Sequence, residues 1–184
     1  MTPRIATVDP PYSPEIQAAL DRVMPMGVPP LVLFTTLARN PRVFQRFMAG
    51  GLLDPGSISL REREIVVNRA TARCGSEYEW GVHIAFFAEA TALTAEQIHA
   101  TVHGGADAPC WTKRESLLVR LVDALHDEAT IDDALWAQLR HEYEEAQLIE
   151  LIVLTGFYHM VSFVTNGLHL PLEDGAARFP QASP

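Results

Sequence analysis

Four Ser or Thr residues are each followed three positions later by Glu or Gln, and an apolar helical pattern follows each pair. This spacing is that of the capping box, in which each side chain satisfies a backbone N–H of the other residue. Such pairs mark helix beginnings, so they predict four helix starts between residues 59 and 115. The pairs are Ser59 with Glu62, Ser76 with Glu79, Thr94 with Gln97, and Thr112 with Glu115.

Other signals extend the helical pattern to both ends of the chain. Ser13-Pro14 and Asn40-Pro41 each place a capping side chain before a proline at the first helical position. Further helices are expected over residues 132–140 and 144–165. Strand signals are weak, because no two-residue hairpin turn joins two alternating runs. We therefore predict an all-α, single-domain helical bundle.

The distribution of prolines and apolar residues indicates three segments. We expect residues 1–30 to be a proline-rich arm with one short helix, residues 31–173 to form the helical domain, and residues 174–184 to be a loose tail. The last long helix is apolar on nearly all faces and must be buried on most of them. A monomer of 184 residues can scarcely bury such a helix, so part of it is expected to face another subunit.

The acidic composition limits the classes of partner. The chain has 14 Lys and Arg against 23 Asp and Glu, a net charge of −9. Nucleic acids need clustered positive charges, so none is expected as a partner. No uninterrupted apolar run reaches the roughly 18 residues that cross a bilayer, and the N-terminal segment lacks the apolar part of a secretory signal. We expect a cytoplasmic protein without membrane contact.

Cysteine and histidine spacing gives no metal or disulfide signal. Cys74 and Cys110 lie far apart and form no CxxC pair, so neither a disulfide framework nor a dithiol redox site is expected. HExxH is absent, and the pair His99 and His103 has no carboxylate in the expected place. We interpret that pair as a helix end and predict no metal site.

Residues 74–83, CGSEYEWGVH, concentrate polar groups beside an apolar run. Glu79 and His83 are four residues apart and share one helix face. The preceding helix carries Glu64 and should form an antiparallel hairpin with this one, because the connection is short. At about 1.5 Å per residue, Glu64 lies roughly 14 Å before its helix end and His83 roughly 10 Å into the next helix. Glu64 and His83 are therefore at nearly the same distance from the turn that joins the helices, so the two can meet with Glu79, which favours a proton-transfer group.

Each of these residues also has a purely structural explanation. Glu79 at the third helical position fits a capping box, Glu64 fits a solvated helix face, and His83 fits a core histidine with one hydrogen bond. Cys74 beside Arg73 is either a thiol of lowered pKa or a small residue in a turn. The residues alone leave these alternatives open.

A longer segment resembles a known family. Residues 59–100, with an Arg- and Glu-rich helix start, the motif YEWxxH and the helix LTAEQI, resemble the core of the carboxymuconolactone decarboxylase family, which includes the alkylhydroperoxidase D-type proteins. Residues 111–136 and 150–173 resemble the C-terminal part of its longer, single-repeat members. The resemblance covers roughly residues 30–173 and implies the alkylhydroperoxidase D-like fold and a homo-oligomer, a trimer or a hexamer.

The resemblance also implies site residues. Peroxidase members carry a Glu, a CxxC pair and a His as a proton relay. Counting back from His83 places Glu64 at the relay glutamate, and Ser76 and Glu79 at the two cysteine positions. A dithiol cycle needs a second sulfur, which argues against peroxidase activity. Decarboxylase members work without a CxxC pair, on small lactone acids.

We therefore predict a cofactor-free acid–base enzyme that acts on a small carboxylate- or lactone-bearing substrate. His83 is the predicted acid–base group, Glu79 orients it or shares its proton, and Glu64 completes the relay. Residues predicted to line the site or bind substrate are Trp80, Tyr78, Cys74, Phe87 and Arg73, with Arg69 as an alternative anchor for a carboxylate. Two alternatives remain: a thiol peroxidase or redox sensor that uses Cys74, and a non-catalytic structural oligomer.

Overall fold

The computed structural model describes residues 3–182, and the regular elements in this part of the chain are nine α-helices. The all-α prediction is confirmed. The helices are α1 (Pro14–Val23), α2 (Val32–Leu37), α3 (Pro41–Ala49), α4 (Leu60–Arg73), α5 (Glu77–Thr91), α6 (Ala95–His103), α7 (Lys113–Glu128), α8 (Asp133–Glu142) and α9 (Glu145–Leu168).

Most helices begin where their capping residues predict. Ser59, Thr94 and Thr112 form complete capping boxes at the starts of α4, α6 and α7. Ser13 and Asn40 cap α1 and α3, each with a proline in the first turn. Helix α2 lacks a side-chain cap, which explains why no capping signal in the sequence predicts it.

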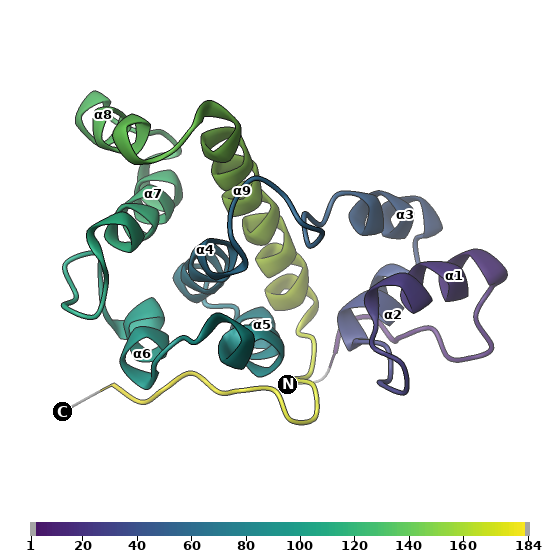
Figure 1. Cartoon of the computed structure of the whole chain (residues 1–184). Coiled ribbons are helices and arrows are strands. Elements are labelled where there is room, and N and C mark those ends of the chain that lie inside the picture. The colour runs from purple at the N-terminus through teal and green to yellow at the C-terminus, as the bar shows by residue number, and fades with distance from the viewer. Residues whose placement is uncertain (1–2, 183–184) are drawn as a thin grey trace.

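Helix α4 occupies the middle of the bundle. In Figure 1 it is enclosed by α5, α6, α7 and α9, and every residue from 63 to 71 is buried. Polar side chains in such a place need partners. Arg69 pairs with Asp123 of α7 at 2.7 Å and donates to the carbonyls of Thr101 and Gly104. Arg69 therefore links α4 to α7 and to the end of α6, and its charge is already paired with a carboxylate.

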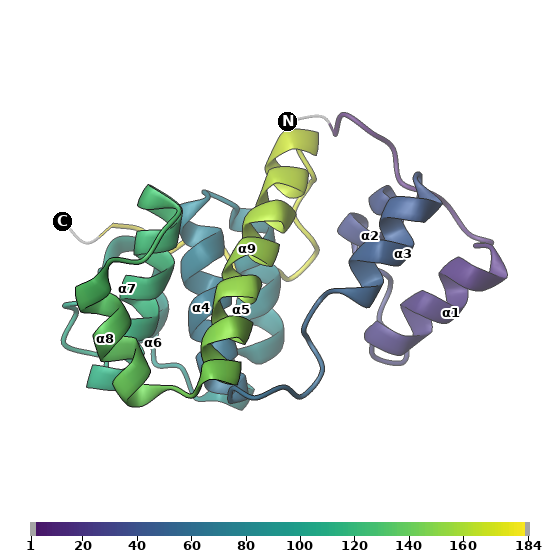
Figure 2. The same cartoon turned by 90° about the horizontal axis from the view of Figure 1, so that it is seen from above.

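Helices α1, α2 and α3 form a layer beside the bundle, as Figure 2 shows from above. Helix α1 packs against α3, across the expected boundary between residues 30 and 31. The ring of Phe47 lies 6.3 Å from Phe34 within this layer and 5.2 Å from Phe157 of α9. The proline-rich segment is therefore packed onto the rest of the chain through α1.

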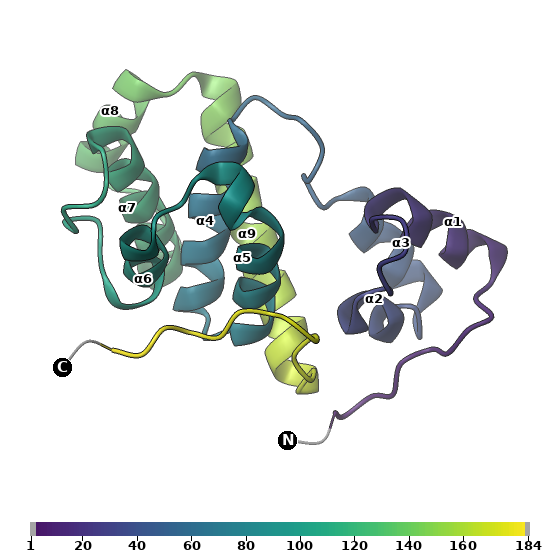
Figure 3. The same cartoon turned by 60° about the horizontal axis from the view of Figure 1, so that its bottom comes forward.

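The segment after α9 runs along α5 and α6, as Figure 3 shows. The backbone N–H of Ala177 donates to the Gly81 carbonyl at 3.2 Å, and that of Phe179 donates to Glu77 at 2.9 Å. The Phe179 ring lies 5.2 Å from the Trp80 ring. Gly81 allows this approach, because a Cβ there would lie 2.2 Å from the Ala177 oxygen. These contacts hold a segment that the sequence suggests is loose.

Helix α9 is long and apolar enough, by length and composition, to span a membrane. An 18-residue window within it has a mean hydropathy of 1.7. Glu150, Gly156 and His159 interrupt the apolar run in the sequence, but the average over the window remains high. Of that window, 44% is buried in the structure, where α9 packs against α4, α5, α7 and α8. Core helices of soluble proteins have the same composition, so this is weak evidence for a membrane span.

Candidate active site

Four buried ionisable side chains form a row where α4 and α5 pack together. His83 Nδ1 donates to Glu64 Oε2 at 2.7 Å, and the other oxygen of Glu64 pairs with Arg63 at 2.7 Å. His83 Nε2 lies 3.5 Å from Glu79 Oε1. All four residues are at most 7% exposed, and Glu64 is 0% exposed. The predicted meeting of Glu64, Glu79 and His83 across the hairpin is therefore observed.

The carboxylate of Glu79 faces His83 and does not cap its helix. The Glu79 backbone N–H donates to Ser76 Oγ at 3.4 Å, but the reciprocal bond is not formed, because the Ser76 N–H donates to the Thr71 carbonyl. Among the described residues, Glu79 Oε2 is buried and has no hydrogen-bond partner. A buried carboxylate oxygen is costly without a donor, so Oε2 marks a place where a substrate group can bind.

The charges in the row favour the imidazolium form of His83. Burial opposes this form, but the carboxylates of Glu64 and Glu79 outweigh burial and raise the pKa of His83 to about 9. At neutral pH both ring nitrogens of His83 therefore carry protons. The charges of Arg63, Glu64, His83 and Glu79 alternate in sign along the row and sum to zero, which reduces the free-energy cost of burying them.

The row ends at a cavity of about 250 Å³ between the N-terminal layer and the bundle. Glu79 and His83 are the charged residues of its lining, and Tyr158 of α9 adds a hydroxyl. Burial, with Glu79 and Glu64 nearby, holds the pKa of Tyr158 well above its ordinary value, so it stays a neutral phenol. Most of the remaining lining is apolar. It includes Leu33, Phe34 and Phe47 on one side and Phe86, Phe87 and Phe157 on the other.

Of the residues predicted to line the site, Phe87 lies in the wall of the cavity. Its ring lies 5.3 Å from the His83 ring, and the Arg63 guanidinium stacks over it at 4.8 Å. Arg63 was not among the predicted site residues, because REREI offers two arginines and their spacing alone does not show which of them pairs with Glu64. Arg61 instead pairs with Glu115 of α7 at 2.7 Å.

Tyr78 and Trp80 point away from the cavity, so their predicted place in its lining is wrong. The Tyr78 hydroxyl accepts from the Leu33 N–H at 3.0 Å and donates to Glu173. Trp80 Nε1 donates to Thr101 Oγ1 at 3.0 Å, beneath the C-terminal segment. Consecutive helical residues point about 100° apart, so the neighbours of Glu79 turn to other faces of α5.

Arg73 and Cys74 also lie outside the His83 site, at the far end of α4. Arg73 pairs with Asp127 at 2.5 Å and with Asp123 at 3.5 Å, so it anchors α4 to α7 and is not placed to bind a substrate carboxylate. Cys74 Sγ lies 3.9 Å from His126 Nδ1 of α7. Burial raises the pKa of the Cys74 thiol, which disfavours a reactive thiolate.

Comparison with sequence families finds a match that contains the row. The model of the carboxymuconolactone decarboxylase family matches residues 39–124. No curated protein matches the chain.

Comparison with solved structures finds the same fold at low sequence identity. An uncharacterized peroxidase-related protein from Silicibacter sp. TM1040 is 17% identical, with a TM-score of 0.80 over 98% of this chain and 99% of the other. An alkylhydroperoxidase AhpD core protein from Ralstonia eutropha JMP134 is 19% identical, with a TM-score of 0.77 over 87% and 86%. A variant of the debrominase Bmp8 in complex with 2,3,4-tribromopyrrole is 13% identical, with a TM-score of 0.78 over 95% and 94%.

Proposed function

The chain belongs, through residues 39–124, to the carboxymuconolactone decarboxylase family, and from this premise we propose that it is an enzyme that moves protons on a small lactone-like substrate without a cofactor. One observation carries the proposal. A buried imidazolium and a buried carboxylate lie 3.5 Å apart at the wall of an apolar cavity. Such a pair supplies an acid and a base in one place, shielded from bulk water.

Glu79 and His83 take complementary roles in this proposal. Glu79 Oε2, which has no protein partner, accepts the proton from the carbon next to a carbonyl group. The electron pair moves onto the carbonyl oxygen, where the His83 Nε2–H donates to the developing negative charge. Where the substrate carries a C=C bond conjugated with this enolate, the proton then returns to the far carbon of that bond, and the double bond shifts by one position.

Glu64 and Arg63 act as positioning residues. Glu64 fixes the orientation of the imidazole through Nδ1 and keeps it protonated, which leaves Nε2–H free for a substrate. The distance from Nε2 to Glu79 is 3.5 Å, longer than a good hydrogen bond, so this donor is not committed to Glu79. Arg63 balances Glu64 and is held by the Leu53 carbonyl at 2.8 Å.

The charge of the cavity favours a neutral carbonyl group over a free carboxylate at the reacting end of the substrate. Its lining contains no Arg or Lys, and the charge of His83 is already matched by two carboxylates. The arginines considered as anchors, Arg69 and Arg73, are paired with aspartates of α7. A lactone or similar ester with an apolar body therefore fits this site better than an organic acid.

The alternative of a thiol peroxidase has less support, although two of the similar structures carry peroxidase-related names. The positions that match the CxxC pair hold Ser76 and Glu79. Cys74 lies at the far end of α4 with a raised thiol pKa, and it contacts His126 rather than His83. A dithiol peroxidase needs a low-pKa thiolate and a second sulfur to resolve it.

Deuterium exchange tests the proposal without knowledge of the natural substrate. A panel of small lactones is incubated with the protein in deuterated water, and nuclear magnetic resonance follows deuterium uptake next to the carbonyl. We expect uptake that falls at least about 100-fold in Glu79→Gln and in His83→Gln, since general acid–base groups contribute factors of this size. Glu89→Gln, an exposed carboxylate on the same helix, should have no effect.

The exchange assay, together with a hydroperoxide assay, separates the proposed enzyme from a thiol peroxidase and from a structural oligomer. Cys74→Ser should retain the exchange activity, and hydroperoxide turnover with a dithiol reductant should be negligible. Hydroperoxide turnover that is lost in a folded Cys74→Ser variant would instead support the peroxidase. A protein that shows neither activity and whose His83 resonances do not respond to any lactone would support a structural oligomer.

A further inference from the structure

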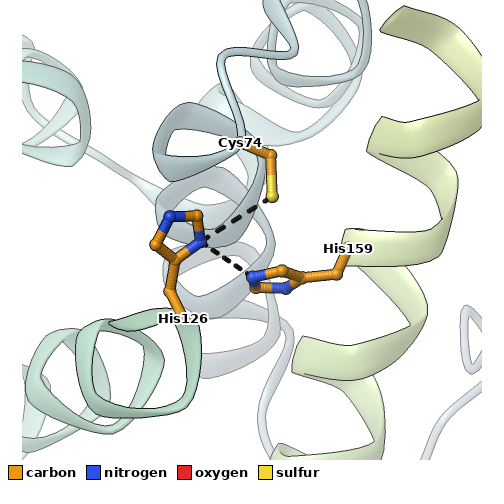
Figure 4. A group of neighbouring side chains, drawn as sticks. All are labelled: Cys74, His126 and His159. Carbon is orange, nitrogen blue, oxygen red and sulfur yellow. Dashed lines mark hydrogen bonds between the residues drawn. The ribbon is translucent and has the colours of Figure 1, made fainter. Parts of the chain in front are cut away.

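A thiol and two imidazoles meet at a junction of three helices, away from the His83 cavity. Cys74 follows the last residue of α4, His126 lies in the last turn of α7, and His159 lies in the middle of α9. Figure 4 shows the three side chains pointing toward one another. His126 Nδ1 lies 2.9 Å from His159 Nε2 and 3.9 Å from Cys74 Sγ. All three donor atoms lie within 4.8 Å of one another.

The hydrogen bond on the far side of His159 prepares it to bind a cation. His159 Nδ1 lies 2.8 Å from the carbonyl oxygen of Thr155, one turn earlier in α9. A carbonyl can only accept, so Nδ1 carries the proton and, in the neutral ring, Nε2 carries the lone pair. Histidines that bind metals are oriented in this way by a hydrogen bond from the other nitrogen. The lone pair of His159 thus points at His126 and the centre of the group.

We propose that Cys74, His126 and His159 bind a divalent transition-metal ion with the preferences of zinc. Zinc lies about 2.3 Å from sulfur and about 2.0–2.1 Å from nitrogen in tetrahedral sites. These lengths place two nitrogens about 3.3 Å apart, and a sulfur and a nitrogen about 3.6 Å apart. Two of the corresponding separations here are 2.9 and 3.9 Å, and the third, between the Cys74 sulfur and the His159 nitrogen, is at most 4.8 Å. Side-chain rotations that move these atoms by up to about 1 Å complete the geometry.

The ligand types exclude hard cations. Mg²⁺ and Ca²⁺ prefer carboxylate, carbonyl and water oxygens, whereas one thiolate with two imidazoles suits zinc. The nearby Arg73 does not oppose a cation at full strength, since its charge is matched by Asp127 and Asp123. All three ligands are half-buried, so water can reach a fourth coordination position.

The proposed metal joins the ends of α4 and α7 to α9 and lies on a different face of α9 from the cavity. Tyr158 lines the cavity, whereas His159, the next residue, turns about 100° away toward the metal group. The metal would therefore stabilise the fold and would not act on a substrate in the cavity. Because binding requires the three helices to be in place, its free energy adds to the stability of the folded chain.

Cobalt substitution tests the proposal on the full-length chain. The purified protein is stripped with a chelator and titrated with Co²⁺ under reducing conditions. We expect one Co²⁺ per chain, with a thiolate-to-cobalt charge-transfer band and the visible bands of four-coordinate cobalt, both removed by Zn²⁺. Cys74→Ser should lose the charge-transfer band, and His159→Gln should weaken zinc binding at least about 100-fold, beyond the loss seen when an outer partner is removed.

Two matched variants serve as controls. Cys110→Ser removes the other cysteine, and His103→Gln removes a histidine of the pair His99 and His103, so both should bind cobalt as the wild type does. Circular dichroism checks that each variant is folded, and thermal unfolding of the wild type should rise with zinc. Failure to bind cobalt would overturn the proposal. So would binding without a thiolate band, or a zinc-induced rise in thermal stability that persists in Cys74→Ser and His159→Gln.

Discussion

Glu64 is the residue on which the charged row depends. It is fully buried and lies between Arg63 and His83, with contacts of 2.7 Å to each. Removing one partner from a buried ion pair leaves an uncompensated charge, which typically costs about 3–5 kcal/mol. Glu64 therefore has a structural role as well as the positioning role proposed for it.

Glu64→Gln should lower the free energy of unfolding by about 3 kcal/mol, because Arg63 loses its neutralising partner. Urea denaturation at neutral pH measures this change, with Glu89→Gln as the exposed control, for which a change within about 0.5 kcal/mol is expected. Equal stability of the two variants would mean that the row contributes nothing to the fold.

The raised pKa of His83 makes stability depend on pH. The folded protein holds the His83 proton up to about pH 9, whereas the unfolded chain releases it near the ordinary value of 6.5. Between these values the folded state binds more protons, so the stabilisation that is complete below pH 6.5 is lost as the pH rises through 9. Two and a half units correspond to about 3 kcal/mol at most.

Urea denaturation between about pH 6 and pH 9.5 should therefore show a falling free energy of unfolding. In His83→Gln the fall should be smaller, because the titrating group is absent. A fall of equal size in both proteins would assign the pH dependence to other groups.

At the residue scale, the sequence predicted contacts within a helix and between two helices joined by a short turn. It did not predict contacts between helices that are far apart in the sequence. Glu64, Glu79 and His83 could be predicted to meet, because their spacing and helix levels follow from helix geometry. Cys74 was misplaced, because its position beside His126 and His159 depends on how α7 and α9 pack on α4. Such long-range packing leaves no trace in local spacing.

At the scale of elements, α5 presents different faces to different partners. One face carries Glu79 and His83 toward the cavity, and another carries Trp80 and Gly81 beneath the C-terminal segment. The second face is closed by the contact of Ala177 with Gly81. The segment after α9 thus depends on a glycine in the middle of a helix.

Gly81→Ala should release this segment, although alanine favours a helix by about 1 kcal/mol. The new Cβ would lie 2.2 Å from the Ala177 oxygen, so the segment must move away. Hydrogen exchange of residues 176–180 should become faster. In Gly167→Ala, where a Cβ meets no atom within 4 Å, exchange of the same residues should be unchanged. Unchanged exchange in Gly81→Ala would show that the contact is not close in solution.

The helices themselves could largely be predicted, because capping residues act locally. Three of the four expected capping boxes are complete. At Ser76 only the bond from the Glu79 backbone N–H to the Ser76 hydroxyl forms, because the Glu79 side chain turns to His83 instead. Helix α2 and the packing of α1–α3 against the cavity were not predicted. That wall is built from apolar residues such as Phe34 and Phe47, whose partners lie far away in the sequence.

At the scale of the whole molecule, α9 keeps an apolar stripe that the described part of the chain leaves exposed. Phe163 is 67% exposed and Ile149 is 65% exposed. The stripe consists of Ile149, Val153, Gly156, Met160 and Phe163. Their spacing alternates between four and three residues, as in the seam between packed helices. Large apolar patches are rare on monomers, so we propose that another copy of the chain covers this stripe.

Light scattering should therefore give a multiple of the chain mass of 20.4 kDa at micromolar concentration. Phe163→Glu should shift the protein toward the monomer, because a charge in an apolar interface is desolvated without a partner. Trp136→Glu, at an exposed aromatic residue of α8, is the matched control and should leave the assembly unchanged. A wild-type protein that is monomeric would contradict the proposed contact.

The central feature of the site is a His83 imidazolium held between two carboxylates, and titration of His83 by nuclear magnetic resonance measures it directly. We expect a pKa of about 9 in the wild type. Both Glu64→Gln and Glu79→Gln should lower the pKa of His83, and Glu64→Gln should lower it more, since Glu64 lies at 2.7 Å and Glu79 at 3.5 Å. A His83 that titrates near 6.5 in the wild type, and is unchanged in a folded Glu79→Gln variant, would contradict an acid–base centre here.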